Sequence, residues 1–282
     1  MKKRRLFIKV QRSNLPQVSD KYPFIYLERG RLEIDDSSVK WIDSEGNLVR
    51  IPVALLNAIL LGPGTSVTHE AVKVMTSANC TVCWVGEDSL LFYAVGQSPT
   101  ADTRNLKRQM ELASSKTSRL DVARKMFLYR FPQEEVISKN LSELMGMEGK
   151  RVRASYELYA KKYQVHWGGR GYVPGKFELS DFTNKVLTAA NAALYGILTS
   201  AVYSQGFSPH IGFVHSGSPL PFIYDLADLY KEELCIDLAF YLTREMHGVY
   251  NRHKVAEEFR ERVIEIDLLG RIGKDIKSIL GI

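Results

Sequence analysis

The segment from Gly212 to Lys231 contains the residue types best suited to metal-dependent chemistry. It places His215 in a stretch rich in glycine and proline, followed by a predicted helix that carries Asp225 and Asp228. Because the two aspartates are three residues apart, they are predicted to share one face of that helix. The opposing apolar face is formed by Ile223, Leu226, Ala227 and Tyr230.

One imidazole and one or two carboxylates with open coordination positions suit Mg²⁺ or Mn²⁺, which leave room for water and a substrate phosphate. The pattern leaves an alternative open. Aspartates in the first turn of a helix also complement its dipole, and a loop histidine can be purely structural.

Glu148 is the third acidic candidate and lies in a predicted helix that is rich in arginine. Arg151 follows it by three residues and shares its face, and Arg153 is close by. A carboxylate beside arginines is what a site for a metal ion and a phosphate would contain. An ordinary ion pair between Glu148 and Arg151 on a solvated helix explains the same pattern.

The elements that must position these residues fall into two halves with different hydrophobic periods. From Tyr22 to Val95, short alternating runs rich in Ile, Val and aromatic residues predict strands, with one helix over residues 68–76. A polar, turn-rich stretch follows, and the pattern then becomes helical. Helical spacing is found over residues 106–129, 138–163, 181–205, 222–247 and 255–269. The sequence therefore predicts an α+β protein with a β-rich domain at 1–97 and an α-helical domain at 98–282.

The 282 residues are enough to bury a substantial core, and 45% of them are hydrophobic. A net charge of +6 favours polyanionic partners without selecting one. No run reaches the ~18 apolar residues of a membrane span, and the apolar run after Met1 is too short for a signal peptide. We therefore expect no membrane association and a cytoplasmic location.

Cysteine usage supports the same compartment. The three cysteines are Cys80, Cys83 and Cys235, an odd number that makes a disulfide framework a poor fit. Cys80 and Cys83 have zinc-ligand spacing, but no second such pair exists in the sequence. We interpret them as buried apolar residues in a strand.

Taken together, the two candidate segments resemble the adaptation (spacer-acquisition) integrase family of CRISPR systems. The segments are Glu148-Gly-Lys-Arg151-Val-Arg153 and, further along, Gly212-Phe-Val-His215 with Tyr224-Asp225-Leu-Ala-Asp228. Three further runs resemble its type I-E branch: Trp84-Val-Gly-Glu87, Arg124-Lys-Met-Phe127 and Asn191-Ala-Ala-Leu-Tyr195. The resemblance covers about residues 14 to 270.

The resemblance implies a small N-terminal β-sandwich-like domain and a larger all-α catalytic domain. It also implies that Glu148, His215 and Asp228 are catalytic and bind the metal, Mg²⁺ or Mn²⁺. Asp225 is expected to be either a residue that supports a ligand or an additional ligand.

The implied reaction is a metal-dependent transesterification. The 3′-hydroxyl ends of a short captured duplex attack phosphodiesters at the edge of the leader-proximal CRISPR repeat, once on each strand. Attack by water at the same site would give endonuclease activity. The implied partners are double-stranded DNA with single-stranded 3′ ends, CRISPR repeat DNA, a second copy of the chain, and a small companion subunit whose dimer bridges two integrase dimers. The N-terminal domain would supply the dimer, companion and DNA contacts.

DNA must also be held largely without regard to sequence, by cations on phosphates and by aromatic rings stacked on unpaired bases. The candidate residues are Arg29, Arg119, Arg153, Tyr172, Tyr195 and Lys231. For Tyr195, packing in the core of its own helix is an equally good explanation.

One position departs from the family pattern. Relatives carry an aromatic residue after the first strand that wedges open the end of the captured duplex, whereas the matching residue here is Arg29. Either Tyr26 takes that role, or Arg29 stacks through its planar guanidinium, or the end is opened differently.

Two other functions remain open at this stage. One is a structure-specific, metal-dependent nuclease of DNA repair, and the other is a DNA-binding scaffold whose acidic residues are structural. The C-terminal run 255–282 could provide a partner face, although packing against its own domain is the preferred interpretation.

Overall fold

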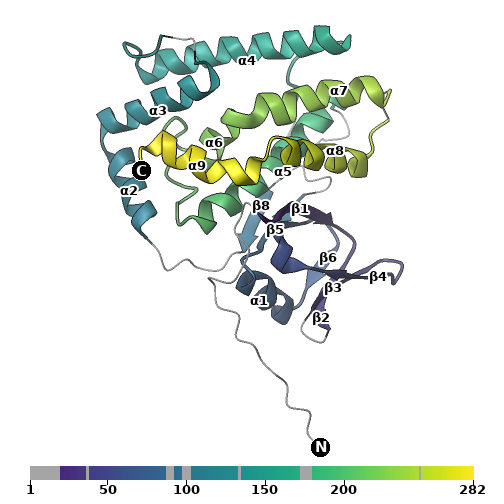
Figure 1. Cartoon of the computed structure of the whole chain (residues 1–282). Helices are drawn as coiled ribbons and strands as arrows, with labels where there is room; N and C mark the ends of the chain where they lie inside the picture. The colour runs from purple at the N-terminus through teal and green to yellow at the C-terminus, as the bar shows by residue number, and fades with distance from the viewer. Residues whose placement is uncertain are drawn as a thin grey trace, which may run out of the picture.

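The computed structural model describes residues 20–35, 38–86, 92–96, 103–132, 135–171, 180–247 and 249–282. It has an N-terminal β-strand part and a larger helical part (Figure 1), so the α+β class with a β half before a helical half is confirmed. The last strand ends at Gly96 and the next helix begins at Arg104. The linker predicted between them lies mostly outside the described residues, and the boundary at 97 stays a prediction.

In its described residues, the N-terminal part has two four-stranded sheets and one helix. One sheet has the order β1 (Tyr22–Leu27), β5 (Leu56–Leu61), β7 (Thr81–Val85) and β8 (Phe92–Gly96), and only the last pair is antiparallel. The other has the order β4 (Leu48–Ile51), β3 (Ser38–Asp43), β2 (Gly30–Asp35) and β6 (Thr65–Val67). A short 3-10 turn, Val53–Leu55, precedes β5, and α1 (His69–Ser77) confirms the predicted helix.

Strand β5 is buried at every position because both faces of its sheet are covered. Ala58 and Leu60 belong to the large core shared with the helices, whereas Ile59 and Leu61 belong to the core between the two sheets. Cys83 on β7 is fully buried and carries a free thiol, as predicted, and so does Cys80 just before that strand. The β half is thus a two-layer sandwich with a helical third layer.

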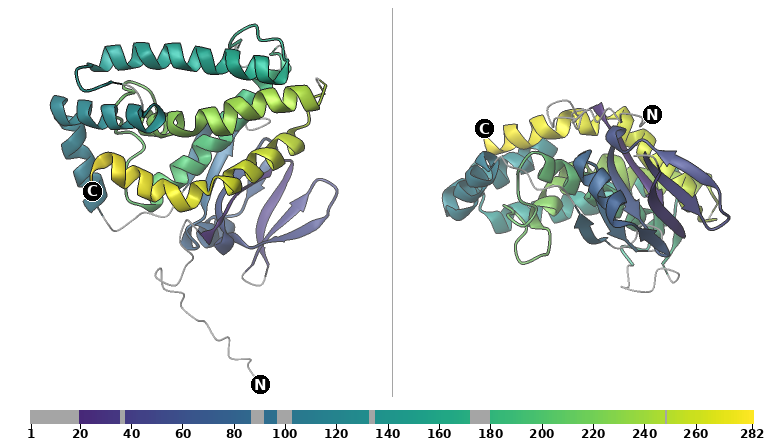
Figure 2. Two further views of the ribbon diagram at one scale, coloured as in Figure 1. Left: turned by 45° about the horizontal axis from the view of Figure 1, so that its top comes forward. Right: turned by 90° about the horizontal axis from the view of Figure 1, so that it is seen from below.

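The helical part is built around α5 (Phe182–Ser204), which lies between the sheet and the other helices (Figure 2). The remaining elements are α2 (Arg104–Ser114), α3 (Lys116–Arg130), α4 (Leu141–Tyr163), α6 (Pro221–Lys231), a π-helical segment Glu232–Ile236, α7 (Asp237–Glu245), α8 (Arg252–Glu265) and α9 (Leu268–Leu280). Helix α4 runs along the side of this half that faces away from the strands (Figures 1 and 2).

Three predicted helices differ in detail from the structure. The helix predicted at 106–129 is two helices, since Ser115 leaves the helical conformation and caps α3 by accepting from Ser118 N–H. The helix predicted at 222–247 contains the π-helical segment. The helix predicted at 255–269 breaks near Asp267, which has a positive φ of 49°, and α9 continues to Leu280.

Within the described part of the chain, one helix, α5, has the length and apolar composition of a membrane span, and most of it is buried in the protein core. The C-terminal helices also pack on their own chain. Phe259, Ile276 and Ile279 are each buried in the large core, as the preferred interpretation of this run predicts.

Candidate active site

The loop that carries His215 is fastened to helix α6 by the carboxylate of Asp225. Three successive backbone N–H groups donate to this carboxylate: Phe213 at 2.5 Å, Val214 at 3.1 Å and His215 at 2.8 Å. Asp225 is only 3% exposed, because the loop folds over its side chain. Asp225 and Asp228 lie on the same side of α6, since both border one cavity, but the loop leaves Asp225 buried.

The sequence of this loop explains its tight path. A Cβ atom on Gly212 would lie 2.7 Å from Cβ of Pro221 and 2.8 Å from the carbonyl oxygen of His215, so only glycine fits there. Gly217 has a φ of +79°, a conformation that glycine adopts without strain. Arg119 on α3 adds a further tie, because its Nε donates to the carbonyl oxygen of Phe213 at 2.7 Å.

The two ring nitrogens of His215 have different partners. Nδ1 is 2.8 Å from Oδ1 of Asp225, and Nε2 is 3.8 Å from Oδ2 of Asp228. The hydrogen bond with Asp225 and the charge of Asp228 raise the pKa of His215 above its ordinary value, although partial burial opposes the shift. A carboxylate that fixes Nδ1 in this way orients Nε2 as a ligand, as is common behind metal-binding histidines.

Lys231, the last residue of α6, neutralises Asp228. Its Nζ lies 2.8 Å from Oδ1 of Asp228 and 5.5 Å from the ring centroid of Tyr195. Burial lowers the pKa of Lys231, but Asp228 and Tyr195 together raise it further, so the net shift is upward. Tyr195 is half-buried and packs edge-on against Tyr224, whose ring lies 6.0 Å from the ring of His215. Tyr195 therefore both packs against the core and lies close to Asp228.

Glu148 lies on α4, and its ion pair is with Arg130 of α3. On the same helix as Glu148, the Arg151 guanidinium lies 5.7 Å from the Phe131 ring centroid. The side chains of Arg130 and Glu148 are 12% and 20% exposed, so water screens the pair only weakly.

Glu148 and Asp228 border the same small cavity, which also touches Asp225 and Arg130. Its volume of about 20 Å³ is the room that a single water molecule occupies. Across the described ranges, no three His, Cys, Asp or Glu side chains are grouped closely enough to hold a metal ion in this conformation.

The donor set is nonetheless the right kind for a hard divalent cation. It combines two carboxylates at one cavity with an imidazole whose Nε2 faces one of them. Each carboxylate is at present balanced by a cationic side chain, Arg130 or Lys231. By the chemistry of their donor atoms, these residues fit Mg²⁺ or Mn²⁺.

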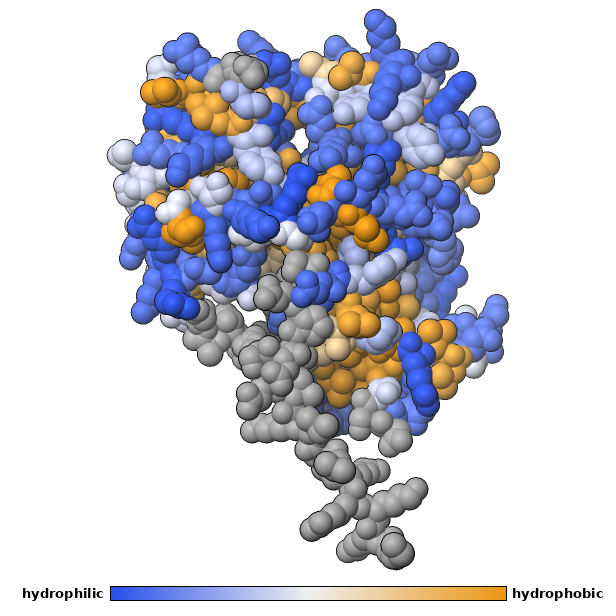
Figure 3. All heavy atoms as spheres, in the orientation of Figure 1, coloured by the Kyte–Doolittle hydropathy of each residue, from blue (hydrophilic) through white to orange (hydrophobic). Residues whose placement is uncertain are grey.

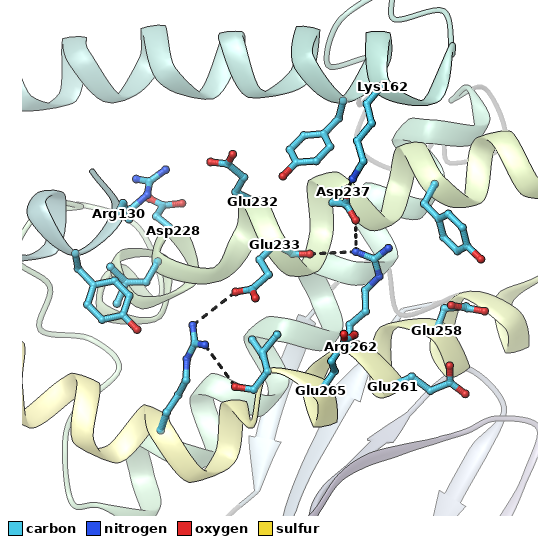
Figure 4. Close-up of a pocket in the computed structure, with 16 residues that line it drawn as sticks. Arg130, Lys162, Asp228, Glu232, Glu233, Asp237, Glu258, Glu261, Arg262 and Glu265 are labelled. Carbon is cyan, nitrogen blue, oxygen red and sulfur yellow. Dashed lines mark hydrogen bonds and ion pairs between the residues drawn. The ribbon is translucent and has the colours of Figure 1, made fainter. Parts of the chain in front are cut away.

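A groove of about 1020 Å³ opens beside this cavity and is bordered by both Arg130 and Asp228 (Figure 4). Asp237 at the start of α7 lies in its wall and accepts from Lys162 Nζ and Tyr163 Oη, each at 2.8 Å, and from Arg262. This cluster joins α4, α7 and α8, and so fixes the helix of Glu148 relative to the helices that follow Asp228.

The remaining DNA-binding candidates lie in separate places. Arg153 is exposed on α4. Arg29 lies in the turn between β1 and β2, with a side chain that is 63% exposed and a φ of 54°. The Tyr26 hydroxyl donates to Glu28 at 2.7 Å, and its ring packs on the large core. Of the two side chains, that of Arg29 is thus the more accessible to solvent. Tyr172 lies outside the described residues.

Sequence reasoning did not identify Arg130, Tyr224 or Asp237 as site residues. Arg130 is separated from Glu148 by a helix end and a connection, so no helical spacing relates the two. Tyr224 precedes Asp225 in the motif, but its position does not distinguish it from other residues of the predicted helix. The hydrogen-bond partners of Asp237 come from two other helices, and no spacing in the sequence indicates that they meet there.

Comparisons with known proteins found a matching family and several similar proteins. The chain matches the family described as "CRISPR associated protein Cas1" over residues 24–137 and 132–257. It is 67% identical over 277 residues to "CRISPR-associated endonuclease Cas1 2" of Chlorobaculum tepidum, an alignment that covers 98% of this chain and 94% of the relative. It is also 39% identical over 235 residues to "CRISPR-associated endonuclease Cas1" of Escherichia coli K12, covering 83% of this chain and 77% of the relative.

Solved structures show the same fold. The crystal structure of TtCas1 superposes with a TM-score of 0.82 at 32% identity, covering 93% of this chain and 98% of TtCas1. The TtCas1-DNA complex gives a TM-score of 0.67 at 34% identity, covering 94% of this chain and 99% of that one. A chain of a Cas6-RT-Cas1–Cas2 complex shares the fold alone, with a TM-score of 0.61 at 16% identity over 85% of this chain and 29% of that one.

Proposed function

The chain belongs to the Cas1 family of CRISPR-associated proteins, and on that premise we propose that Glu148, His215 and Asp228 form one site at which it both cuts and joins DNA. The chain is a DNA endonuclease and integrase of CRISPR adaptation. What remains to be assigned is which residues perform the chemistry, with which metal, and on which DNA.

The observation that carries this proposal is the pairing of Asp225 with Nδ1 of His215. The pairing leaves Nε2 directed at Asp228, while Asp228 borders the same cavity as Glu148. A purely structural histidine would need no second carboxylate at its other nitrogen. The buried Asp225 therefore supports His215 rather than serving as an open ligand.

Glu148, His215 and Asp228 would hold Mg²⁺ or Mn²⁺, which polarises a phosphate and stabilises the charge that develops on its oxygens. The chain's own residues arrange the rest. Asp225 and Arg119 hold the His215 loop in place. Lys231 keeps a positive charge beside Asp228, where a substrate phosphate would arrive.

The proposed joining reaction is attack by the 3′-hydroxyl of a captured duplex on a phosphodiester at the leader-proximal repeat. One P–O bond forms to the attacking oxygen, the bond to the neighbouring nucleotide breaks, and the released 3′-hydroxyl takes up a proton. With water as the nucleophile the same displacement gives cleavage.

The proposed partners are DNA, a second copy of this chain and a small companion subunit of the Cas2 kind, with two integrase dimers bridged by one companion dimer. The DNA complex of TtCas1 supports DNA as a partner, and the Cas1–Cas2 assembly supports the companion subunit. The N-terminal half offers a contact surface, since edge strand β4 exposes Leu48 and Val49 at 52% and 54%. Figure 3 shows hydrophobic side chains gathered over this half of the molecule. Similarity to the Escherichia coli relative supports the type I-E branch, and a cytoplasmic location is part of the same proposal.

The test is an integration assay with purified chain, a companion subunit, a labelled short duplex and a supercoiled repeat-bearing plasmid, with Mg²⁺, with Mn²⁺ or with chelator. We expect label to join the plasmid only with metal. Glu148→Ala, His215→Ala and Asp228→Ala should each abolish cutting and joining together. Glu157→Ala, an exposed change on the same helix as Glu148, should keep both.

Loss of only one activity in any of the three variants would refute a shared site. Metal-dependent cleavage without joining would indicate a repair nuclease. DNA binding without turnover, unaffected by Glu148→Gln, would indicate a scaffold.

A further inference from the structure

Arg130 is the cation that balances Glu148, and its position is unusual for a structural ion pair. The two side chains come from α3 and α4, which are already held together by a separate apolar cluster that includes Phe127, Val136 and Leu144. Packing of the two helices therefore does not depend on the ion pair.

The guanidinium of Arg130 lies between two spaces, a small cavity and an open groove. It borders the small cavity that Glu148 and Asp228 share, and it also borders the open groove beside it. Figure 4 shows Arg130 and Asp228 together at one end of that groove. Arg130 also lies 5.0 Å from the Phe131 ring centroid, a contact that does not depend on Glu148. The side chain could therefore turn from the cavity to the groove without crossing the core.

A divalent ion and an arginine compete for the same carboxylate oxygens, because each is stabilised by the full negative charge. We propose that Arg130 is a displaceable counter-ion: it holds Glu148 before metal binds, releases it to the metal, and then places its guanidinium on a phosphate of the DNA bound at the metal site. This inference rests on the proposed metal site. Because binding free energies are reciprocal, metal would strengthen DNA binding and DNA would strengthen metal binding.

The first experiment measures Mn²⁺ binding to the full chain without DNA, by the electron paramagnetic resonance signal of free Mn²⁺. Arg130→Gln should tighten Mn²⁺ binding by roughly fivefold or more, since it removes the competing cation. Arg130→Met, a neutral side chain that still reaches Phe131, should do the same. Lys125→Gln removes an exposed charge from the same helix and should leave the affinity at the wild-type value.

The second experiment measures DNA affinity with and without Mn²⁺, using a short duplex with single-stranded 3′ ends. In the wild-type chain Mn²⁺ should tighten DNA binding, and in Arg130→Gln and Arg130→Met this enhancement should be largely lost. Lys125→Gln should keep it. A role limited to holding α3 against α4 would lower thermal stability without tightening Mn²⁺.

Glu148→Gln separates failure of this inference from failure of the metal site. If Glu148→Gln binds Mn²⁺ as well as the wild-type chain, the proposed metal site itself is wrong. If Glu148→Gln loses Mn²⁺ binding while Arg130→Gln and Arg130→Met bind it with wild-type or lower affinity, the metal site stands and the counter-ion role of Arg130 is refuted.

Discussion

Asp225 accepts hydrogen bonds from both the backbone N–H and the ring Nδ1 of His215, each at 2.8 Å. One buried carboxylate thus fixes the loop and the orientation of the imidazole. Since two further backbone N–H groups donate to the same carboxylate, its removal affects position and stability together.

Asp225→Asn should lower cutting and joining by roughly 10- to 100-fold, as loss of a carboxylate behind a metal-binding histidine does. It should also lower the free energy of unfolding by about 1–3 kcal/mol, since one or more buried N–H groups lose a charged acceptor. The measurements are single-turnover cleavage, Mn²⁺ affinity and urea unfolding. Asp121→Asn, an exposed change on α3, is the control. Wild-type Mn²⁺ affinity in Asp225→Asn would contradict the supporting role.

Arg153→Gln should weaken DNA binding evenly across sequences if this exposed arginine on α4 contacts a phosphate, because phosphate contacts carry no sequence information. The slope of log affinity against log salt should become shallower by about 0.7–0.9, the value for one phosphate contact. The free energy of unfolding should change by no more than about 0.5 kcal/mol. Titrations at several salt concentrations test this, with Lys277→Gln on α9 as the control. An unchanged slope would remove Arg153 from the DNA contacts.

Arg29→Gly, in the turn between β1 and β2, should affect stability and DNA joining differently. Glycine adopts the φ of 54° freely, so stability should hold or rise by up to ~1 kcal/mol. Joining of fully paired duplex ends should fall, whereas joining of ends that are already splayed should be retained. The assay compares the two substrates at equal concentration. Equal loss on both substrates would mean that Arg29 does not open the duplex end.

Asp237→Asn should destabilise the chain by about 1–3 kcal/mol at pH 7, since three donors from α4 and α8 lose a charged acceptor. Burial raises the pKa of Asp237, but Lys162, Arg262 and Tyr163 together lower it below its ordinary value. A lowered pKa in the folded state stabilises the protein above the unfolded pKa near ~4. That stabilisation is lost as the pH falls through the folded pKa.

Urea unfolding at pH 7 and near pH 3 tests this pH dependence. The difference in the free energy of unfolding between wild type and Asp237→Asn should shrink at the lower pH. Glu261→Gln, an exposed change on α8, serves as the control. A difference that stays constant with pH would show that the charge of Asp237 is not what stabilises the cluster.

Much of the fold was accessible from the sequence because hydrophobic periodicity reports on local structure. The change from strands to helices, helix α1 and the core role of the C-terminal helices all follow from the spacing of apolar residues. The break at Ser115 was missed because the apolar spacing continues through it, while the cap depends on a single side chain.

The site was only partly accessible for a related reason. The spacing of Asp225 and Asp228 indicated a shared face, but the loop that buries Asp225 folds back from earlier in the chain. The partner of Glu148 was missed because Arg130 meets it through helix packing. Local spacing identifies the carboxylates, and tertiary structure decides which cation or backbone group each one meets.

The sheet that contributes Ala58 and Leu60 to the helical core couples the stability of the two halves. A fragment that began near residue 98 would present the apolar face of its own central helix to solvent and would tend to aggregate. A chimera that takes its N-terminal half from a relative would also replace the residues of that half that pack in the helical core. Heat should accordingly melt the whole chain in one cooperative transition, although its sequence reads as two domains.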